Sequence, residues 1–147
     1  MANCIFNEAK RLILVGGIGG PLAAMLVRES YVPNPDQIAI DDGTVSDPAS
    51  HELSVGGYAR KTLTNMVIGK DIATDFAYMD ADDVPFGALL AGQTIGGILV
   101  YKEGATDGVR VPFFFYETPD TPTNGSQITV QWASIGAGAL LKATQAG

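Results

Sequence analysis

An acidic cluster, Asp80 to Asp83, is the part of this sequence whose residue types could most directly do chemistry. Carboxylate oxygens suit Ca²⁺, which takes about six to eight oxygen ligands. The helix-loop-helix calcium motif needs alternating acids, a central glycine and a distal glutamate, and the residues Val84 to Phe86 interrupt that spacing. We therefore expect the aspartates to end a strand and to support a turn through side chain to backbone hydrogen bonds. Whether Asp80, Asp82 and Asp83 also bind a cation is left open.

Other groups for acid–base or nucleophilic catalysis are sparse. His51 is the single histidine and stands beside Glu52 in a predicted loop. A nucleophile would need this imidazole within hydrogen-bonding distance, together with an orienting acid, so we expect a solvated loop histidine. The 16 acidic residues always allow some pair to be nominated for glycoside hydrolysis, because tertiary distance defines such a pair. We predict no catalytic residue and a protein that is not an enzyme.

Glycine pairs at Gly16-Gly17, Gly19-Gly20 and Gly96-Gly97 raise the question of a phosphate-binding loop. The dinucleotide fingerprint fails because Leu22 stands at its last position, and Gly69-Lys70 lacks the earlier glycine that a P-loop requires. We therefore predict no cofactor. Inside a strand, Gly96-Gly97 is expected to permit close backbone approach or a bulge.

Composition limits the protein class. The chain has 147 residues, 46% of them hydrophobic and 17% charged, which is typical of one folded domain. A formal net charge of −7 disfavours binding to the phosphate backbone, so nucleic acid is not an expected partner. Cys4 is the single cysteine, which rules out a disulfide within one chain and leaves the redox compartment undetermined.

The N-terminal region contains a basic pair, Lys10-Arg11, followed by the uncharged run Leu12 to Val27. This order resembles a secretory signal, which is the alternative reading. The run is shorter than the ~20 residues of a membrane span, and its central glycines and proline would break a helix, so no membrane is expected. We predict a helix over Glu8 to Val15, capped by Asn7, and then a strand over Leu22 to Glu29.

The clearest secondary-structure signal lies between Asp80 and Trp132. The apolar runs Thr94 to Lys102 and Val109 to Tyr116 predict two strands, and Gln127 to Trp132 predicts a third after the turn-rich Glu117 to Ser126. Together they predict a β-meander. Extended segments are also expected from Glu52 onward, whereas prolines, aspartates and glycines predict loops between Tyr31 and Pro48.

These elements predict a mainly β protein, either a small β-sandwich or a jelly-roll-like domain, with a short N-terminal helix. Turn signals recur often enough for about seven to nine short strands. We expect residues 1–20 to form an N-terminal arm and the short helix, and residues 21–147 to form a single β-sandwich domain.

Four short segments, in this order, resemble small structural proteins of tailed bacteriophages. They are Gly57 to Leu63, Asp80 to Val84, Ile95 to Lys102 and Pro122 to Trp132, and the resemblance covers about residues 55 to 142. It implies a head decoration protein or a related virion component, with a small β-sandwich fold and no catalytic residues. It also implies the outer surface of the virion head as location, with the major capsid protein and copies of the chain itself, a trimer being one arrangement, as partners.

Contacts with such partners would require apolar and aromatic side chains at the surface. The N-terminal arm could become ordered on a partner, and the aromatic run that follows Pro112 could form either core or a subunit interface. The candidate partner-binding residues are Ile5, Phe6, Phe113, Phe115, Tyr116 and Trp132.

Two alternative functions remain at this stage. A tail, neck or fibre component of the virion would use the same kind of fold. A carbohydrate-binding β-sandwich module would present Trp132 or Tyr116 to sugars. The sequence leaves head or tail location, the number of copies, the partner-contacting face and the host undetermined.

Overall fold

The chain folds mainly into β-strands, in a computed structural model that describes residues 3–17, 20–44, 46–73, 76–132 and 141–144. In chain order the elements are β1 (Cys4–Ile5), α1 (Asn7–Leu14), β2 (Leu22–Arg28), the 3-10 helix η1 (Pro48–His51), β3 (Lys61–Thr62), β4 (Val67–Asp71), β5 (Phe76–Asp80), β6 (Val84–Ala88), β7 (Thr94–Lys102), β8 (Val111–Pro122), β9 (Gln127–Val130) and β10 (Leu141–Thr144). The predicted fold class, a mainly β sandwich with a short N-terminal helix, is confirmed.

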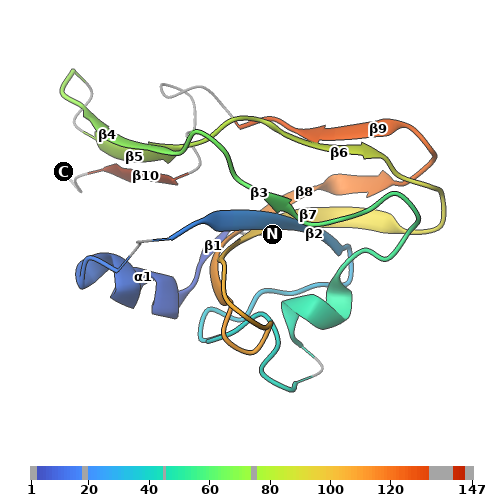
Figure 1. The fold of residues 1–147 in the computed structure, drawn as a ribbon, viewed down its shortest axis with the longest axis horizontal. Helices are drawn as coiled ribbons and strands as arrows, with labels where there is room; N and C mark the ends of the chain where they lie inside the picture. The colour runs from blue at the N-terminus through green and yellow to red at the C-terminus, as the bar shows by residue number, and fades with distance from the viewer. Residues whose placement is uncertain (1–2, 18–19, 45, 74–75, 133–140, 145–147) are drawn as a thin grey trace.

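The strands are arranged in two β-layers (Figure 1). One layer is a five-stranded sheet with the order β1-β8-β7-β2-β3. The other layer consists of two smaller sheets, a three-stranded one with the order β10-β5-β4 and a two-stranded one with the order β6-β9. Figure 1 shows both smaller sheets on one face of the five-stranded sheet, while α1 and the long loops lie on its other face. The five-stranded sheet is therefore the middle of the molecule.

The core is centred on β2 and β7. Leu22 to Val27 of β2 and Ile95 to Tyr101 of β7 are buried at every position, so their side chains are covered on both faces of the sheet. A strand covered on both faces has no polar face, and it reads as a continuous apolar run. This explains why the boundaries of β7 agree with the predicted strand Thr94 to Lys102.

The glycine pair in β7 allows two close approaches, as predicted. A Cβ atom on Gly96 would lie 2.4 Å from the Cα of Glu29, and one on Gly97 would lie 2.4 Å from Cε2 of Phe115. The pairing of β7 with β8 also shifts in register between Ile95 and Gly97. The missing side chains thus let the neighbouring backbone and the Phe115 ring pack directly on the strand.

The predicted meander is only half correct. β7 and β8 pair antiparallel, but β9 pairs with β6 and lies in the other layer. One edge of β8 is occupied by β7, and part of the other edge, at Phe114 and Phe115, is occupied by β1. The turn at Gly125, where φ is +87°, then carries the chain to the second layer. β8 also continues to Pro122, through residues that were predicted as a turn.

The N-terminal helix forms as predicted, with a different start. Its N-cap is Phe6, so the predicted capping role of Asn7 is wrong. Asn7 instead donates a hydrogen bond from Nδ2 to Asp36 (2.7 Å) and accepts one from Lys10 (3.0 Å). Just before the helix, Cys4–Ile5 pairs with β8, so this part of the arm belongs to the five-stranded sheet.

The close contact at Gly97 leads to a stability prediction. Gly97→Ala should lower the free energy of unfolding by about 2–3 kcal/mol, because the new methyl group meets both the Phe115 ring and the Tyr116 carbonyl oxygen. Urea denaturation measures this loss. Gly108→Ala is the control, since a Cβ there meets nothing closer than 3.8 Å. Equal stability of the two variants would contradict the assignment of a packing role to Gly97.

Candidate functional site

The acidic cluster ends strand β5, as predicted, but Asp82 forms its hydrogen bonds with side chains, where side chain to backbone bonds were predicted. It lies between the end of β5 and the start of β6. Asp82 accepts hydrogen bonds from the Thr64 hydroxyl (3.1 Å) and from Nδ2 of Asn65 (2.6 Å), and Asp83 accepts one from the backbone N–H of Trp132 (3.1 Å). Among the residues that the structure describes, no three His, Cys, Asp or Glu side chains are grouped so that they could hold a metal ion.

His51 is placed by η1 and is only half exposed, so the expectation of a solvated loop histidine is corrected. Its Nδ1 atom shares a hydrogen bond with the Ser30 hydroxyl (3.0 Å), and its ring centroid lies 5.6 Å from that of Tyr31. Tyr31 is buried and also meets Phe115 edge to face. The imidazole therefore helps to close the long loop over the core.

The most extensive polar arrangement is an ion cluster around Arg60. The guanidinium forms two hydrogen bonds with Glu52, at 2.7 Å from Nε and 2.6 Å from Nη2, and two with Asp107, at 2.7 Å from Nη1 and 2.9 Å from Nη2. Arg110 also binds Asp107, and the Arg60 guanidinium lies 5.6 Å from the centroid of the Tyr101 ring. Such paired, charge-assisted hydrogen bonds fix geometry, and here they join two loops, the one between η1 and β3 and the one between β7 and β8.

The pKa shifts in this cluster match a structural role. Hydrogen bonds from Arg60 lower the pKa of Asp107 to about 2, against an opposing effect of burial. Burial and the nearby carboxylate of Glu52 raise the pKa of Tyr58, whose hydroxyl donates to Glu52 and accepts from the N–H of Leu26. Asp107 is therefore stabilised in its charged form and Tyr58 in its protonated form. The guanidinium of Arg60 uses its hydrogen-bond donors on Glu52 and Asp107 of the same chain.

Asp47 is a second carboxylate with a structural role. Its side chain is buried and accepts hydrogen bonds from Nε2 of Gln37 (2.6 Å) and from the backbone N–H groups of Gly43 and Thr44, both at 2.9 Å. Burial alone would raise the pKa of Asp47, but hydrogen bonds from residues 42 to 44 outweigh it and lower the pKa to about 2. This carboxylate therefore organises the loop before η1.

Three of the predicted partner-binding residues are core residues, which corrects that expectation. Phe6, Phe113 and Phe115 are essentially fully buried. Phe113 and Phe115 lie on β8, and Phe6 follows β1 at the same part of the sheet. Their side chains are covered by the chain itself, so they are not available to a partner in the folded protein.

Tyr116 and Trp132 are half-buried and pack on each other, with ring centroids 6.1 Å apart. The indole N–H of Trp132 donates to the carbonyl oxygen of Asp82 (3.0 Å), and burial raises the pKa of Tyr116 to about 12. The pair links β8 to the acidic turn, where Asp83 also holds the Trp132 backbone N–H. A partner contact at these two residues stays a prediction.

Ile5 lies at the surface beside an apolar groove. The groove has a volume of about 400 Å³, and its other apolar walls come from Val32, Pro33 and Pro35. Ile5 is partly exposed, and Val32 is more so. A partner contact at Ile5 stays a prediction. Removal of the whole N-terminal arm would not test this contact cleanly, because Phe6 is part of the core.

The structure also exposes aliphatic residues that sequence reasoning missed. Val67 and Ile68 of β4 are 51% and 63% exposed, and Ile72, just after the strand, is 78% exposed. Strand β4 is at the edge of the three-stranded sheet, and successive residues of a strand face opposite sides, so both faces of this edge present an aliphatic side chain. A signal was present, since Val67 and Ile68 are adjacent apolar residues in a predicted strand. We call Val67, Ile68 and Ile72 the β4 edge.

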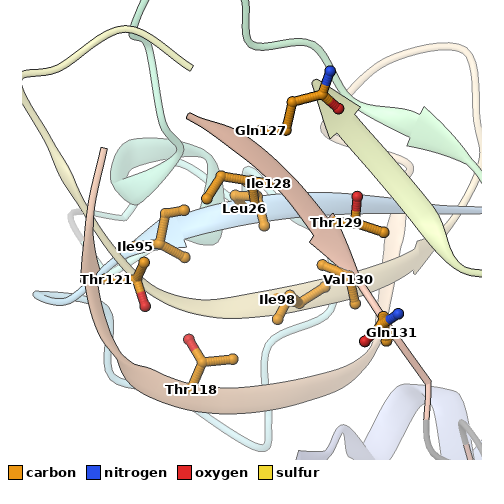
Figure 2. Close-up of a pocket in the computed structure, with 10 residues that line it drawn as sticks. All are labelled: Leu26, Ile95, Ile98, Thr118, Thr121, Gln127, Ile128, Thr129, Val130 and Gln131. Carbon is orange, nitrogen blue, oxygen red and sulfur yellow. The ribbon is translucent and has the colours of Figure 1, made fainter. Parts of the chain in front are cut away.

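A cleft lies between the two β-layers (Figure 2). It has a volume of about 360 Å³. Its walls come from β2, β7 and β8 of the five-stranded sheet and from β9 of the two-stranded sheet, and Figure 2 shows Ile98 beside Val130 of β9, with Ile95 to one side of that strand. The residues lining it are Leu26, Ile95, Ile98, Thr118, Thr121, Gln127, Ile128, Thr129, Val130 and Gln131.

Comparison with protein-family models, curated proteins and solved structures found no match. Within the described part of the chain, no helix is both long and apolar enough to cross a membrane.

The ion cluster leads to a test of its contribution to stability. Arg60→Ala should lower the free energy of unfolding by about 2 kcal/mol, because it leaves Glu52 and Asp107 partly buried without their main cation. Arg11→Ala is the control, since it removes a solvent-exposed ion pair with Glu8 and should leave the urea midpoint nearly unchanged. Equal midpoints for the two variants would contradict the structural role of Arg60.

The two lowered carboxylate pKa values predict acid sensitivity. Asp47 and Asp107 have folded-state pKa values of about 2, below their ordinary 3.8, so the unfolded chain takes up these protons at higher pH than the folded chain does. Their stabilising contribution is complete above about pH 4 and is lost as the pH falls through about 2. Thermal unfolding between pH 6 and pH 2 measures it. The Asp107→Asn variant should be less stable than the unaltered protein at pH 6, and its stability should fall less between pH 6 and pH 2. A fall in stability equal to that of the unaltered protein would contradict this prediction.

Proposed function

We propose that this chain is a non-enzymatic structural protein of a tailed bacteriophage virion. In this proposal it binds the major capsid protein on the outer surface of the head and stabilises the capsid lattice as a decoration protein. The observation that carries the proposal is the β4 edge, where Val67 and Ile68 are exposed on opposite faces of an edge strand and Ile72 is exposed just after it. Several exposed apolar side chains along one sheet edge are typical of an interaction surface.

The polar groups support a role in assembly. The side chains that resembled catalytic equipment in the sequence, Asp82, His51 and Glu52, each form hydrogen bonds that hold a turn or a loop. These polar side chains are thus used for contacts within the chain, whereas the β4 edge leaves aliphatic side chains exposed.

Burial explains how a small surface could stabilise a lattice. Removing apolar area from water contributes about 25 cal/mol per Å², so covering a few aliphatic side chains gives only modest affinity at one site. A capsid repeats that site many times, and copies joined to each other bind with a much higher effective affinity. Homo-oligomers would therefore strengthen occupancy without a large interface in each copy.

The alternatives differ in location and in ligand. A tail, neck or fibre component would use the β4 edge in the same way, and imaging of labelled virions separates these positions. A carbohydrate-binding module would need an accessible aromatic platform. Trp132 is half-buried, packs on Tyr116 and already donates its indole N–H to Asp82, so this geometry gives that alternative no support.

Capsid occupancy tests the proposal. Ile68→Lys should lower binding to purified undecorated heads at least about tenfold, because it places a charge where an aliphatic side chain would be buried. Sedimentation with the heads measures occupancy. Val109→Lys is the matched control, since Val109 is 59% exposed and lies in the loop between β7 and β8, away from β4. Binding by neither variant nor the unaltered chain would overturn the head location, and equal binding by all three would overturn the role of the β4 edge.

A further inference from the structure

The cleft between the layers lies between β8 and β9, which do not pair with each other. These strands follow each other along the chain, yet β9 pairs with β6 and the space beside it stays open. Figure 2 shows Thr118 and Thr121 of β8 on one side of this space and Thr129 of β9 on the other. The cleft is therefore the position that a further strand of the second layer would occupy.

The hydrogen-bonding pattern of β9 shows which edge faces the cleft. The carbonyl oxygen of Ser126 accepts from the N–H of Leu89, and the N–H of Trp132 donates to Asp83, so even-numbered residues here direct their backbone groups toward the β6 side. Backbone groups alternate along an antiparallel strand. Thr129 stands opposite Pro85, which has no N–H to offer a ladder bond, and this agrees with the same pattern.

It follows that Gln127, Thr129 and Gln131 direct their backbone N–H and C=O groups toward the free edge. All three residues line the cleft. In the part of the chain that the structure describes, β6 is the single strand paired with β9. The cleft thus has one wall of backbone donors and acceptors with the spacing of a β-strand.

The floor of the cleft is aliphatic. Leu26, Ile95 and Ile98 form it from the five-stranded sheet, and Ile128 and Val130 of β9 are only half-covered above it. The ten lining residues include no charged side chain. Thr118 contributes a buried hydroxyl oxygen that has no hydrogen-bond partner within the described chain. An occupant of this site would be uncharged, with aliphatic groups facing the floor and a polar group near Thr118.

We propose that this cleft binds an extended, uncharged segment of a partner protein, which pairs with the free edge of β9 and enlarges the β6-β9 sheet. Alternate side chains of such a segment would point toward Ile95 and Ile98, and the others would face solvent. The free backbone edge favours a strand over a compact small molecule, because a small molecule would leave most of these backbone groups unused. The inference is independent of the proposed capsid role, since it rests on the cleft alone.

A peptide titration tests this proposal with the full-length protein. The probe is a hexapeptide of alternating threonine and isoleucine with blocked ends, and the control peptide has lysine in place of each isoleucine. Binding is followed by the amide signals in the NMR spectrum of the ¹⁵N-labelled protein. We expect saturable shifts at Gln127, Thr129 and Gln131 with the first peptide and none with the second. Absence of shifts with both peptides would overturn the proposal.

Two substitutions separate strand pairing from simple filling of the cleft. Thr129→Pro removes the outward N–H and should weaken binding at least about tenfold, while Thr129→Val keeps the N–H and should bind normally. If Thr129→Pro does not fold, Thr121→Lys is used in its place, because it introduces a charge at the cleft without altering β9. Thr106→Lys is the matched control for Thr121→Lys. Binding that survives Thr129→Pro in a folded protein, or that survives Thr121→Lys, would overturn pairing along β9.

Discussion

The burial of β2 and β7 on both faces is the constraint on which the rest of the structure depends. The two strands are adjacent in the five-stranded sheet and carry almost no polar side chain between Leu22 and Val27 or between Ile95 and Tyr101. Apolar strands of this kind are stable only when both of their faces are removed from water. The helix and long loops must therefore cover one face, and the two smaller sheets must cover the other.

The polar residues follow from that constraint. Long connections cover one side of the sheet, and they need fixed conformations to exclude water from it. Arg60 joins two of these connections through Glu52 and Asp107, and Asp47 fixes the loop before η1 by accepting backbone hydrogen bonds. These acids thus hold loops in place, and the lowered pKa values of Asp47 and Asp107 are a consequence of that use.

The layer formed by the two smaller sheets covers the five-stranded sheet incompletely. It is divided into sheets of three and two strands, each with edges that the described part of the chain does not pair. Unpaired edges next to aliphatic side chains are sites at which another polypeptide can add. The β4 edge offers aliphatic side chains, whereas β9 offers backbone groups above an aliphatic floor. Both features suit a protein whose role is assembly.

The sequence by itself determined the elements whose signals are local. The continuous apolar run from Thr94 to Lys102 predicted β7 correctly, the aspartates end a strand as predicted, and the mainly β fold is confirmed. Only the tertiary structure decided that β9 pairs with β6, that Phe113 and Phe115 are core residues, and which acids surround Arg60. The physical reason is range: an apolar pattern shows that a strand must be buried, but the surface that buries it is chosen by contacts between residues far apart in the chain.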